Sequence, residues 1–141
     1  GGAKRTGRFS ERLGIPMAII DKRRVSDTAV KQGAVVGDVA GRDVVIFEDE
    51  IATAGTLVSS VDTLKAAGAR SIHAAATHGV LCGPAIERLR AAAIDSVVVT
   101  NTVALPEDKR LDKLAVLNVA PLFAAAIERI HSGQSVGALF E

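Results

Sequence analysis

Three consecutive carboxylates carry the clearest chemical signal in this sequence of 141 residues. The apolar run at residues 44–47 leads directly into Glu48, Asp49 and Glu50. Adjacent acids at the edge of a sheet raise one another's pKa unless a cation or a hydrogen-bond donor lies nearby. A vicinal diol is a good partner, because each hydroxyl donates to a carboxylate oxygen, and a metal ion or a group of Lys and Arg side chains would also serve.

A tight turn of small residues, Thr53-Ala54-Gly55-Thr56, follows the acids at the start of a predicted helix. The first N–H groups of a helix have no partner within it, and the helix dipole places partial positive charge there, so the turn can hold an anion. Gly55 allows close approach of the backbone, and the two threonine hydroxyls can donate to phosphate oxygens. The segment is not a Walker A loop, because Gly-Lys-Ser/Thr is absent.

The acids can accept hydrogen bonds from a diol, and the turn after them can bind a phosphate. Together they suit a pentose phosphate that lies across the end of a strand. A plainer interpretation is a helix capped by threonine, with the acids merely solvated. The turn alone favours the plainer interpretation, whereas the acids and the turn in this order favour the ligand site.

A basic loop supplies a second candidate group at residues 22–24, Lys-Arg-Arg. Lys22 and Arg24 could stabilise the charge on a phosphoryl group in transfer, and a loop that closes over substrate would bring them in when needed. The alternative is a solvated run of charge that pairs with residues 48–50.

The elements that must position these groups alternate along the chain. Apolar runs at 17–20, 44–47, 71–77 and 96–100 predict strands covered on both faces, and residues 57–68, 84–93 and 121–131 predict helices. The glycines and aspartates between Val35 and Phe47 predict a β-hairpin that leads into the strand at residue 44. We therefore expect an α/β fold with a mostly parallel sheet flanked by helices, and such sheets bind ligands beyond the carboxyl ends of their strands.

Composition limits the remaining function classes. The chain is 48% hydrophobic and 23% charged with a net charge of +1, which excludes extended disorder and gives no case for a nucleic-acid or membrane partner. Its single cysteine excludes an internal disulfide and fits a reducing compartment, and its three histidines share no metal-ligand spacing, so we predict no metal-binding residues. The first residue is glycine rather than methionine, and we expect a piece of a longer protein.

Several motifs occur in the order found in one enzyme family. They occupy residues 1–5, 18–24, 48–56, 77–88, 98–102 and 127–140. Over essentially its whole length, the chain resembles the C-terminal half of ribose-phosphate pyrophosphokinase, also called phosphoribosyl-pyrophosphate synthetase, which has a phosphoribosyltransferase-like fold.

The resemblance implies transfer of a pyrophosphoryl group from ATP, with Mg²⁺ as cofactor, to the 1-hydroxyl of ribose 5-phosphate. It places Lys22 at the family's catalytic lysine and Arg24 at an arginine that contacts substrate. It assigns the acids to the ribose and the turn to the 5-phosphate. The implied substrate-binding residues are Glu48, Asp49, Ala52, Thr53, Ala54, Gly55 and Thr56.

The resemblance also implies an organisation. Residues 1–141 would form the C-terminal domain that binds ribose 5-phosphate, and most of the ATP site would lie in an N-terminal half outside this chain. We therefore expect the chain alone to catalyse little. The family association implies a cytoplasmic homo-oligomer, in which dimers assemble into hexamers.

Two positions depart from the family's pattern. The signature usually begins with two aspartates, and here the first acid is Glu48; Ala52 stands where an acid is common. Ala52 motivates a second hypothesis, a catalytically silent, regulatory subunit that resembles the synthetase. A phosphoribosyltransferase is a third, although the Lys-Arg-Arg loop and the C-terminal motif argue against it.

Overall fold

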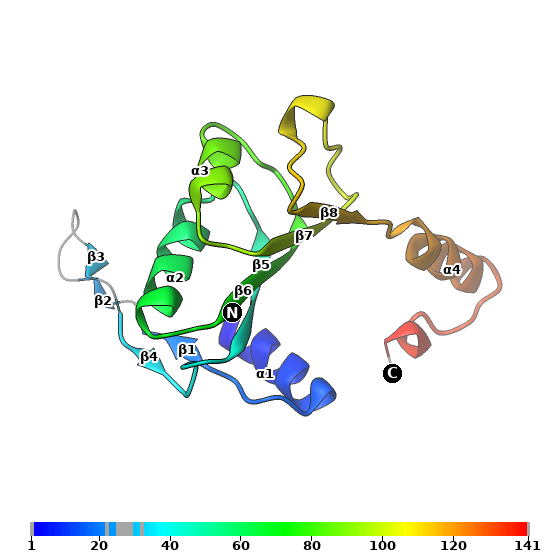
Figure 1. Ribbon diagram of the computed structural model, residues 1–141. Coiled ribbons are helices and arrows are strands. Elements are labelled where there is room, and N and C mark those ends of the chain that lie inside the picture. The colour runs from blue at the N-terminus through cyan, green and yellow to red at the C-terminus, as the bar shows by residue number, and fades with distance from the viewer. Residues whose placement is uncertain (1, 22, 25–29, 32, 141) are drawn as a thin grey trace.

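A parallel sheet of four strands forms the centre of the computed structural model, which describes residues 2–21, 23–24, 30–31 and 33–140 (Figure 1). Its order is β5-β6-β7-β8, with every neighbouring pair parallel. The strands are β5 (Asp43–Glu50), β6 (Ser71–His78), β7 (Ser96–Thr100) and β8 (Leu114–Leu117). The predicted α/β class with a mostly parallel sheet is confirmed, and β8 is an addition that the apolar runs did not predict.

Two helices in the crossover connections pack on one face of this sheet. They are α2 (Gly55–Ala66) and α3 (Ala85–Ala91), and both lie where helices were predicted. Val61 of α2 and Leu89 of α3 are fully buried, and they share one core with Ile72 of β6 and Val97 of β7. This core is built from aliphatic side chains, as the scarcity of aromatic residues requires.

The second face of the sheet is less covered than the apolar runs predict. Along β6, Ile72, Ala74 and Ala76 are buried while His73 and Ala75 are half-buried. Helix α1 (Gly2–Leu13) covers this face beside β5, where the ring of Phe9 stacks on Phe47 with centroids 4.2 Å apart. Because α1 lies against β5 at one edge, the described chain leaves much of the remaining face open (Figure 1).

Short antiparallel strands precede β5, so a hairpin lies before this strand as predicted, but it is formed within residues 19–36 and not between Val35 and Phe47. They are β1 (Ile19–Ile20) with β4 (Val35–Val36) and β2 (Arg23–Arg24) with β3 (Val30–Lys31). The strand expected at residues 17–20 is therefore shorter than predicted and lies outside the parallel sheet. Gly41, with a φ of 68°, turns the chain from β4 into β5, and these two strands do not pair with each other.

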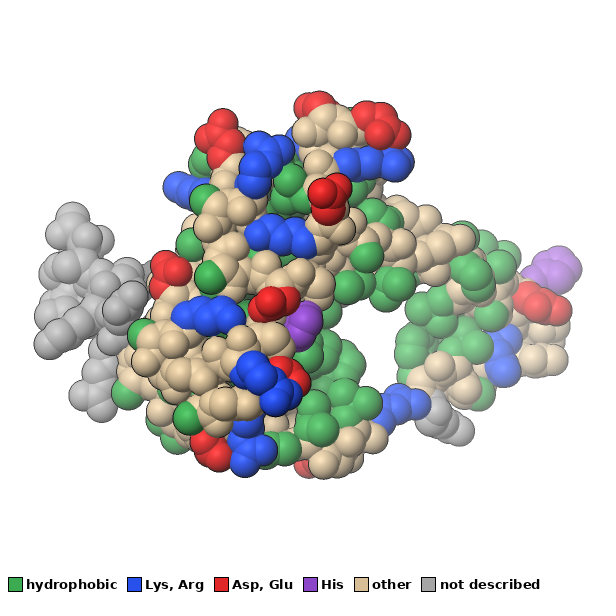
Figure 2. Space-filling model, in the orientation of Figure 1, with side chains coloured by type: hydrophobic (Ala, Val, Ile, Leu, Met, Phe, Trp, Pro, Cys, Tyr) green, Lys and Arg blue, Asp and Glu red, His purple; other side chains and the backbone are tan. Residues whose placement is uncertain are grey.

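The C-terminal helix α4 (Ala120–His131) stands away from the sheet, and a short 3-10 turn at Gly137–Leu139 follows it (Figure 1). Hydrophobic side chains gather on α4 (Figure 2), and those of Leu122, Phe123, Ile127 and Ile130 are exposed. Within the described residues, no helix combines the length and the apolar character that a membrane span requires.

Candidate functional site

The three acids lie at the carboxyl end of β5, as the sequence predicts, but they do not converge on one point. Side chains alternate between the faces of a strand, so Asp49 points to the face opposite Glu48 and Glu50. Asp49 forms an ion pair with Arg5 of α1. Glu48 is half-buried and Glu50 is exposed, and neither forms an ion pair with another described residue.

This arrangement bears on the metal that the resemblance implies. The described residues contain no group of three or more His, Cys, Asp and Glu side chains that could hold a metal ion. Magnesium is commonly held by one or two carboxylates together with the phosphates of a substrate. The acids at the end of β5 therefore fit a metal that arrives with a nucleotide and do not form a metal cage of their own.

The turn after β5 has a backbone that the threonine-cap interpretation does not describe. Helix α2 begins at Gly55, and the residue before it, Ala54, has a φ of 58° in the left-handed region. No side chain caps the helix, and the hydroxyl of Thr53 does not donate to or accept from another described residue. The plainer interpretation of a threonine cap is therefore wrong.

The carbonyl oxygens of residues 51–54, which lead into α2, each accept a hydrogen bond from within the fold. Leu81 and Cys82 donate their backbone N–H groups to the carbonyls of residues 51 and 52, each at 2.9 Å. Arg88 of α3 donates from Nη1 to the carbonyl of Thr53 at 3.0 Å. The carbonyl of Ala54 accepts from the N–H of Val58 at 3.0 Å, in the first turn of α2.

The N–H groups of the same segment are free. None of the backbone N–H groups of residues 53–57 donates to another described residue. Since the carbonyls are engaged with the loop at 78–82, with α3 and with α2, the peptide dipoles leave a row of N–H groups available to a ligand at the N-terminus of a twelve-residue helix. Such a row can bind one phosphate without any charged side chain.

The predicted basic loop is described only in part. Lys22 lies outside the described residues. Arg24 belongs to β2 and pairs through its backbone with Val30, and its side chain lies outside the description. The cations that the described structure brings to the acids and the turn are Arg5 and Arg88, which sequence reasoning missed because each comes from a separate helix.

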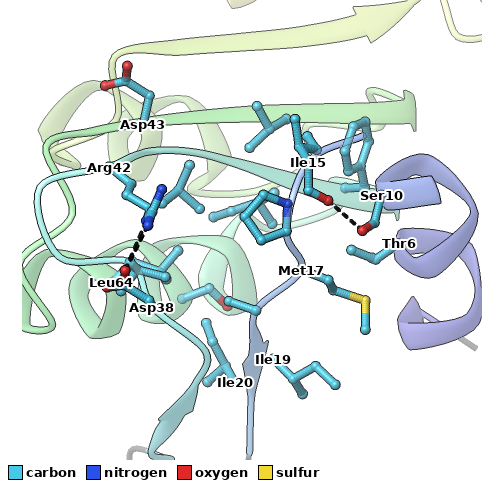
Figure 3. A pocket seen from close by; sticks show the side chains of 18 of the residues that line it. Thr6, Ser10, Ile15, Met17, Ile19, Ile20, Asp38, Arg42, Asp43 and Leu64 are labelled. Atoms are coloured by element: carbon cyan, nitrogen blue, oxygen red, sulfur yellow. Dashed lines mark hydrogen bonds and ion pairs between the residues drawn. The ribbon is translucent and has the colours of Figure 1, made fainter. Parts of the chain in front are cut away.

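Two cavities lie beside the candidate site, and neither has a residue of the turn in its lining. A cavity of about 730 Å³ lies between α1, the segment 15–20 and the outer edge of β5, with Met17, Ile19 and Ile20 among its lining residues (Figure 3). A smaller hollow of about 190 Å³ is lined by Arg5, Glu48 and residues of the sheet. Glu48 is the member of the predicted site that borders both cavities.

Polar groups also order the neighbouring strand ends. The Oγ1 atoms of Thr100 and Thr102 donate to the carbonyl of Thr77 at 2.6 and 3.0 Å. The Nδ1 atom of His78 lies 2.8 Å from Thr102 Oγ1. These contacts join the carboxyl ends of β6 and β7, next to the acids of β5, into one firm edge.

The strongest charge pairing lies at the opposite end of the sheet. Arg70 donates to both carboxylate oxygens of Asp43, and Ser71 Oγ donates to Asp43 Oδ1 at 2.6 Å. The hydrogen bonds from Arg70 and Ser71 hold the pKa of Asp43 well below its usual range. This network joins the first residues of β5 and β6 and has a structural role.

Comparisons with known proteins identify the family of the chain. Residues 25–141 match the family model of the phosphoribosyl synthetase-associated domain. Ribose-phosphate pyrophosphokinases from Caldanaerobacter subterraneus and Deinococcus radiodurans are each 51% identical to 99% of this chain, which spans 44% and 45% of their lengths. The crystal structure of phosphoribosylpyrophosphate synthetase from Mycobacterium smegmatis aligns with a TM-score of 0.82 and 39% identity over 89% of this chain and 40% of that protein. The chain therefore belongs to the phosphoribosyl synthetase-associated domain family.

Proposed function

We propose that this chain supplies the ribose 5-phosphate site of a ribose-phosphate diphosphokinase. In the reaction, the 1-hydroxyl oxygen of ribose 5-phosphate bonds to the β-phosphorus of ATP, the bond between the α- and β-phosphates breaks, and AMP leaves. The products are phosphoribosyl pyrophosphate, AMP and the proton of the hydroxyl. The single observation that carries the proposal is the row of free N–H groups at residues 53–57, beside the acids of β5.

The residues of this chain would divide the sugar phosphate between them. The N–H groups and hydroxyls of Thr53 and Thr56, with the backbone at 52–55, bind the 5-phosphate. The ribose lies across the end of β5, so that its hydroxyls donate to Glu48 on one face of the strand and to Asp49 on the other. Arg5 neutralises Asp49 in the free protein and so lowers the repulsion between these acids and an anionic ligand.

Lys22 and Arg24 would stabilise the charge on the phosphoryl oxygens during transfer. Magnesium, bound to the phosphates of ATP, neutralises their charge when present. We further propose that residues 1–141 are the C-terminal domain of the enzyme, that most of the ATP site lies in a preceding domain, and that the enzyme is a cytoplasmic homo-oligomer built from dimers.

The direct test uses the complete gene product that carries this sequence. With ribose 5-phosphate and magnesium-ATP it should release AMP in step with phosphoribosyl pyrophosphate, and unphosphorylated ribose, the matched control, should not support turnover. Thr53→Val, which removes a hydroxyl and keeps the shape, should raise the KM for ribose 5-phosphate and leave the KM for ATP unchanged. Absence of AMP release would contradict the activity.

Ala52 favours a second candidate, a silent regulatory subunit, because it replaces an acid that is common in the family. Its backbone is well held, since its carbonyl accepts from Cys82 N at 2.9 Å, so an aspartate can occupy the position without rebuilding the loop. A silent subunit should show no turnover alone, should gain turnover in Ala52→Asp and should alter the rate of an active homologue on mixing.

A further inference from the structure

Arg88 is an exposed residue of α3. Its Nη1 atom lies 3.0 Å from the carbonyl oxygen of Thr53. A β-carbon built on Gly55 would lie 3.1 Å from the same nitrogen and 3.7 Å from Thr53 Oγ1. The guanidinium therefore lies over the turn, in space that any side chain at position 55 would enter.

The geometry points to Arg88 as a positioning residue for the phosphate-binding turn, an inference that rests on the proposed ribose 5-phosphate site. By holding the carbonyl of Thr53, Arg88 fixes the peptide between Thr53 and Ala54, whose other end is the N–H group of Ala54. Carbonyl and N–H of one peptide point in opposite directions, so a carbonyl held toward α3 leaves this N–H directed away from it.

The contact has further consequences at the turn. Ala54 is held in the left-handed region, with a φ of 58°, which a non-glycine residue keeps only when its surroundings determine it. A hydrogen bond from a cation to a carbonyl is stronger than one between neutral groups, so Arg88 holds this peptide firmly in one orientation. Arg88 would therefore act on the phosphate through the orientation of the Ala54 N–H group.

The same contact bears on why residue 55 is a glycine. It is not among the glycines with a positive φ, so its backbone does not require glycine. It lies at the start of α2, where alanine has the higher helix propensity. Glycine at this position leaves room for the guanidinium of Arg88, which a methyl group would push aside.

The test measures ribose 5-phosphate KM, ATP KM and kcat for the complete gene product and its Arg88→Ala and Arg88→Lys variants. Loss of one charge-assisted hydrogen bond predicts a rise of about tenfold in the ribose 5-phosphate KM of Arg88→Ala, with kcat and the ATP KM nearly unchanged. Arg88→Lys keeps a cationic donor and should recover part of this loss. Arg90→Ala is the matched control, because the side chain of Arg90, also on α3, makes no hydrogen bond or ion pair with a described residue.

Gly55→Ala tests the same contact with Arg88 itself unchanged. The new methyl group should displace the guanidinium, raise the ribose 5-phosphate KM and leave the unfolding temperature unchanged or higher. If Gly55→Ala acts through Arg88, the double variant should have a ribose 5-phosphate KM no higher than that of Arg88→Ala alone. Multiplication of the two effects in the double variant would contradict this route.

An unchanged ribose 5-phosphate KM in Arg88→Ala would overturn the inference. So would a rise in both KM values together with a fall in kcat and in the unfolding temperature, because such a pattern would show a purely structural residue. Calorimetric titration of the same variants with ribose 5-phosphate separates this result from failure of the proposed activity. A gene product that binds the sugar phosphate through Arg88 but releases no AMP refutes the activity alone, and a wild type that binds none refutes both.

Discussion

Ala54 and Leu81 have φ angles of 58° and 48°, although neither is glycine. Such conformations cost about 1–3 kcal/mol each and persist where the surrounding structure determines them. The two residues lie in facing loops, and Leu81 donates its N–H to the carbonyl of Ile51 at 2.9 Å. Backbone strain is thus concentrated in the two loops that leave the N–H groups of the turn free.

At the residue scale, the role of Lys22 leads to a kinetic prediction. Loss of one preorganised charge-stabilising group costs about 2–4 kcal/mol of transition-state stabilisation. Lys22→Ala in the complete gene product should therefore lower kcat by about 30- to 1,000-fold, with a smaller change in substrate KM. Lys109→Ala, in the 3-10 turn at Glu107–Lys109, is the control and should behave as the wild type. Unchanged turnover in Lys22→Ala would refute the catalytic role.

At the scale of elements, the contacts between strands lead to a pH prediction. Arg70 and Ser71 hold the pKa of Asp43 below its unfolded value of about 3.9. A carboxyl with a lowered folded-state pKa stabilises the fold fully above the unfolded value, and this contribution is lost as the pH falls through the folded value. At pH 7, Asp43→Asn should therefore unfold at a lower urea concentration than the wild type. The difference between the two urea midpoints should narrow near about pH 2.

The pair is exposed to solvent, so added salt should also narrow that gap. Asp62→Asn is the control, because Asp62 is exposed on α2 and forms no ion pair with a described residue. Urea unfolding of the three proteins at both pH values supplies the measurement. A gap between Asp43→Asn and the wild type that stays constant with pH would contradict the assignment.

Packing on the sheet gives a second prediction at this scale. Val97 of β7 is fully buried beneath α2 and α3, whereas Val116 of the edge strand β8 is 42% exposed. Val97→Ala should lower the free energy of unfolding by about 1–3 kcal/mol. The same change at Val116 controls for strand propensity and should cost well under half as much. Equal losses in chemical denaturation would show that β8 is as well packed as β7.

The apolar runs predict β5, β6, β7 and the three helices that follow because local hydrophobicity decides these elements. The strand at 17–20 was wrong in length, because an apolar run does not reveal which partner it pairs with. β8 was missed because Leu-Ala-Val-Leu is short and follows a charged stretch. The acids and the turn could be predicted as neighbours in sequence, whereas Arg5 and Arg88 reach them only through tertiary packing.

At the scale of the whole molecule, apolar surface remains uncovered. Leu117 on the sheet and Ile127 and Ile130 on α4 are 58%, 66% and 68% exposed. Large exposed apolar surfaces often mark sites where proteins associate. We predict that the complete gene product sediments as a homo-oligomer in analytical ultracentrifugation at micromolar concentration. A species of monomer mass across a wide concentration range would contradict the proposed assembly.

The central claim is that free N–H groups after β5 bind the phosphate of ribose 5-phosphate while the acids bind its hydroxyls. A crystal structure of the complete gene product with ribose 5-phosphate tests it most directly. We predict phosphate density within hydrogen-bond distance of the backbone N–H groups of residues 53–57, with the ribose beside Glu48 and Asp49. Sugar phosphate bound elsewhere, with those N–H groups still free, would contradict the account.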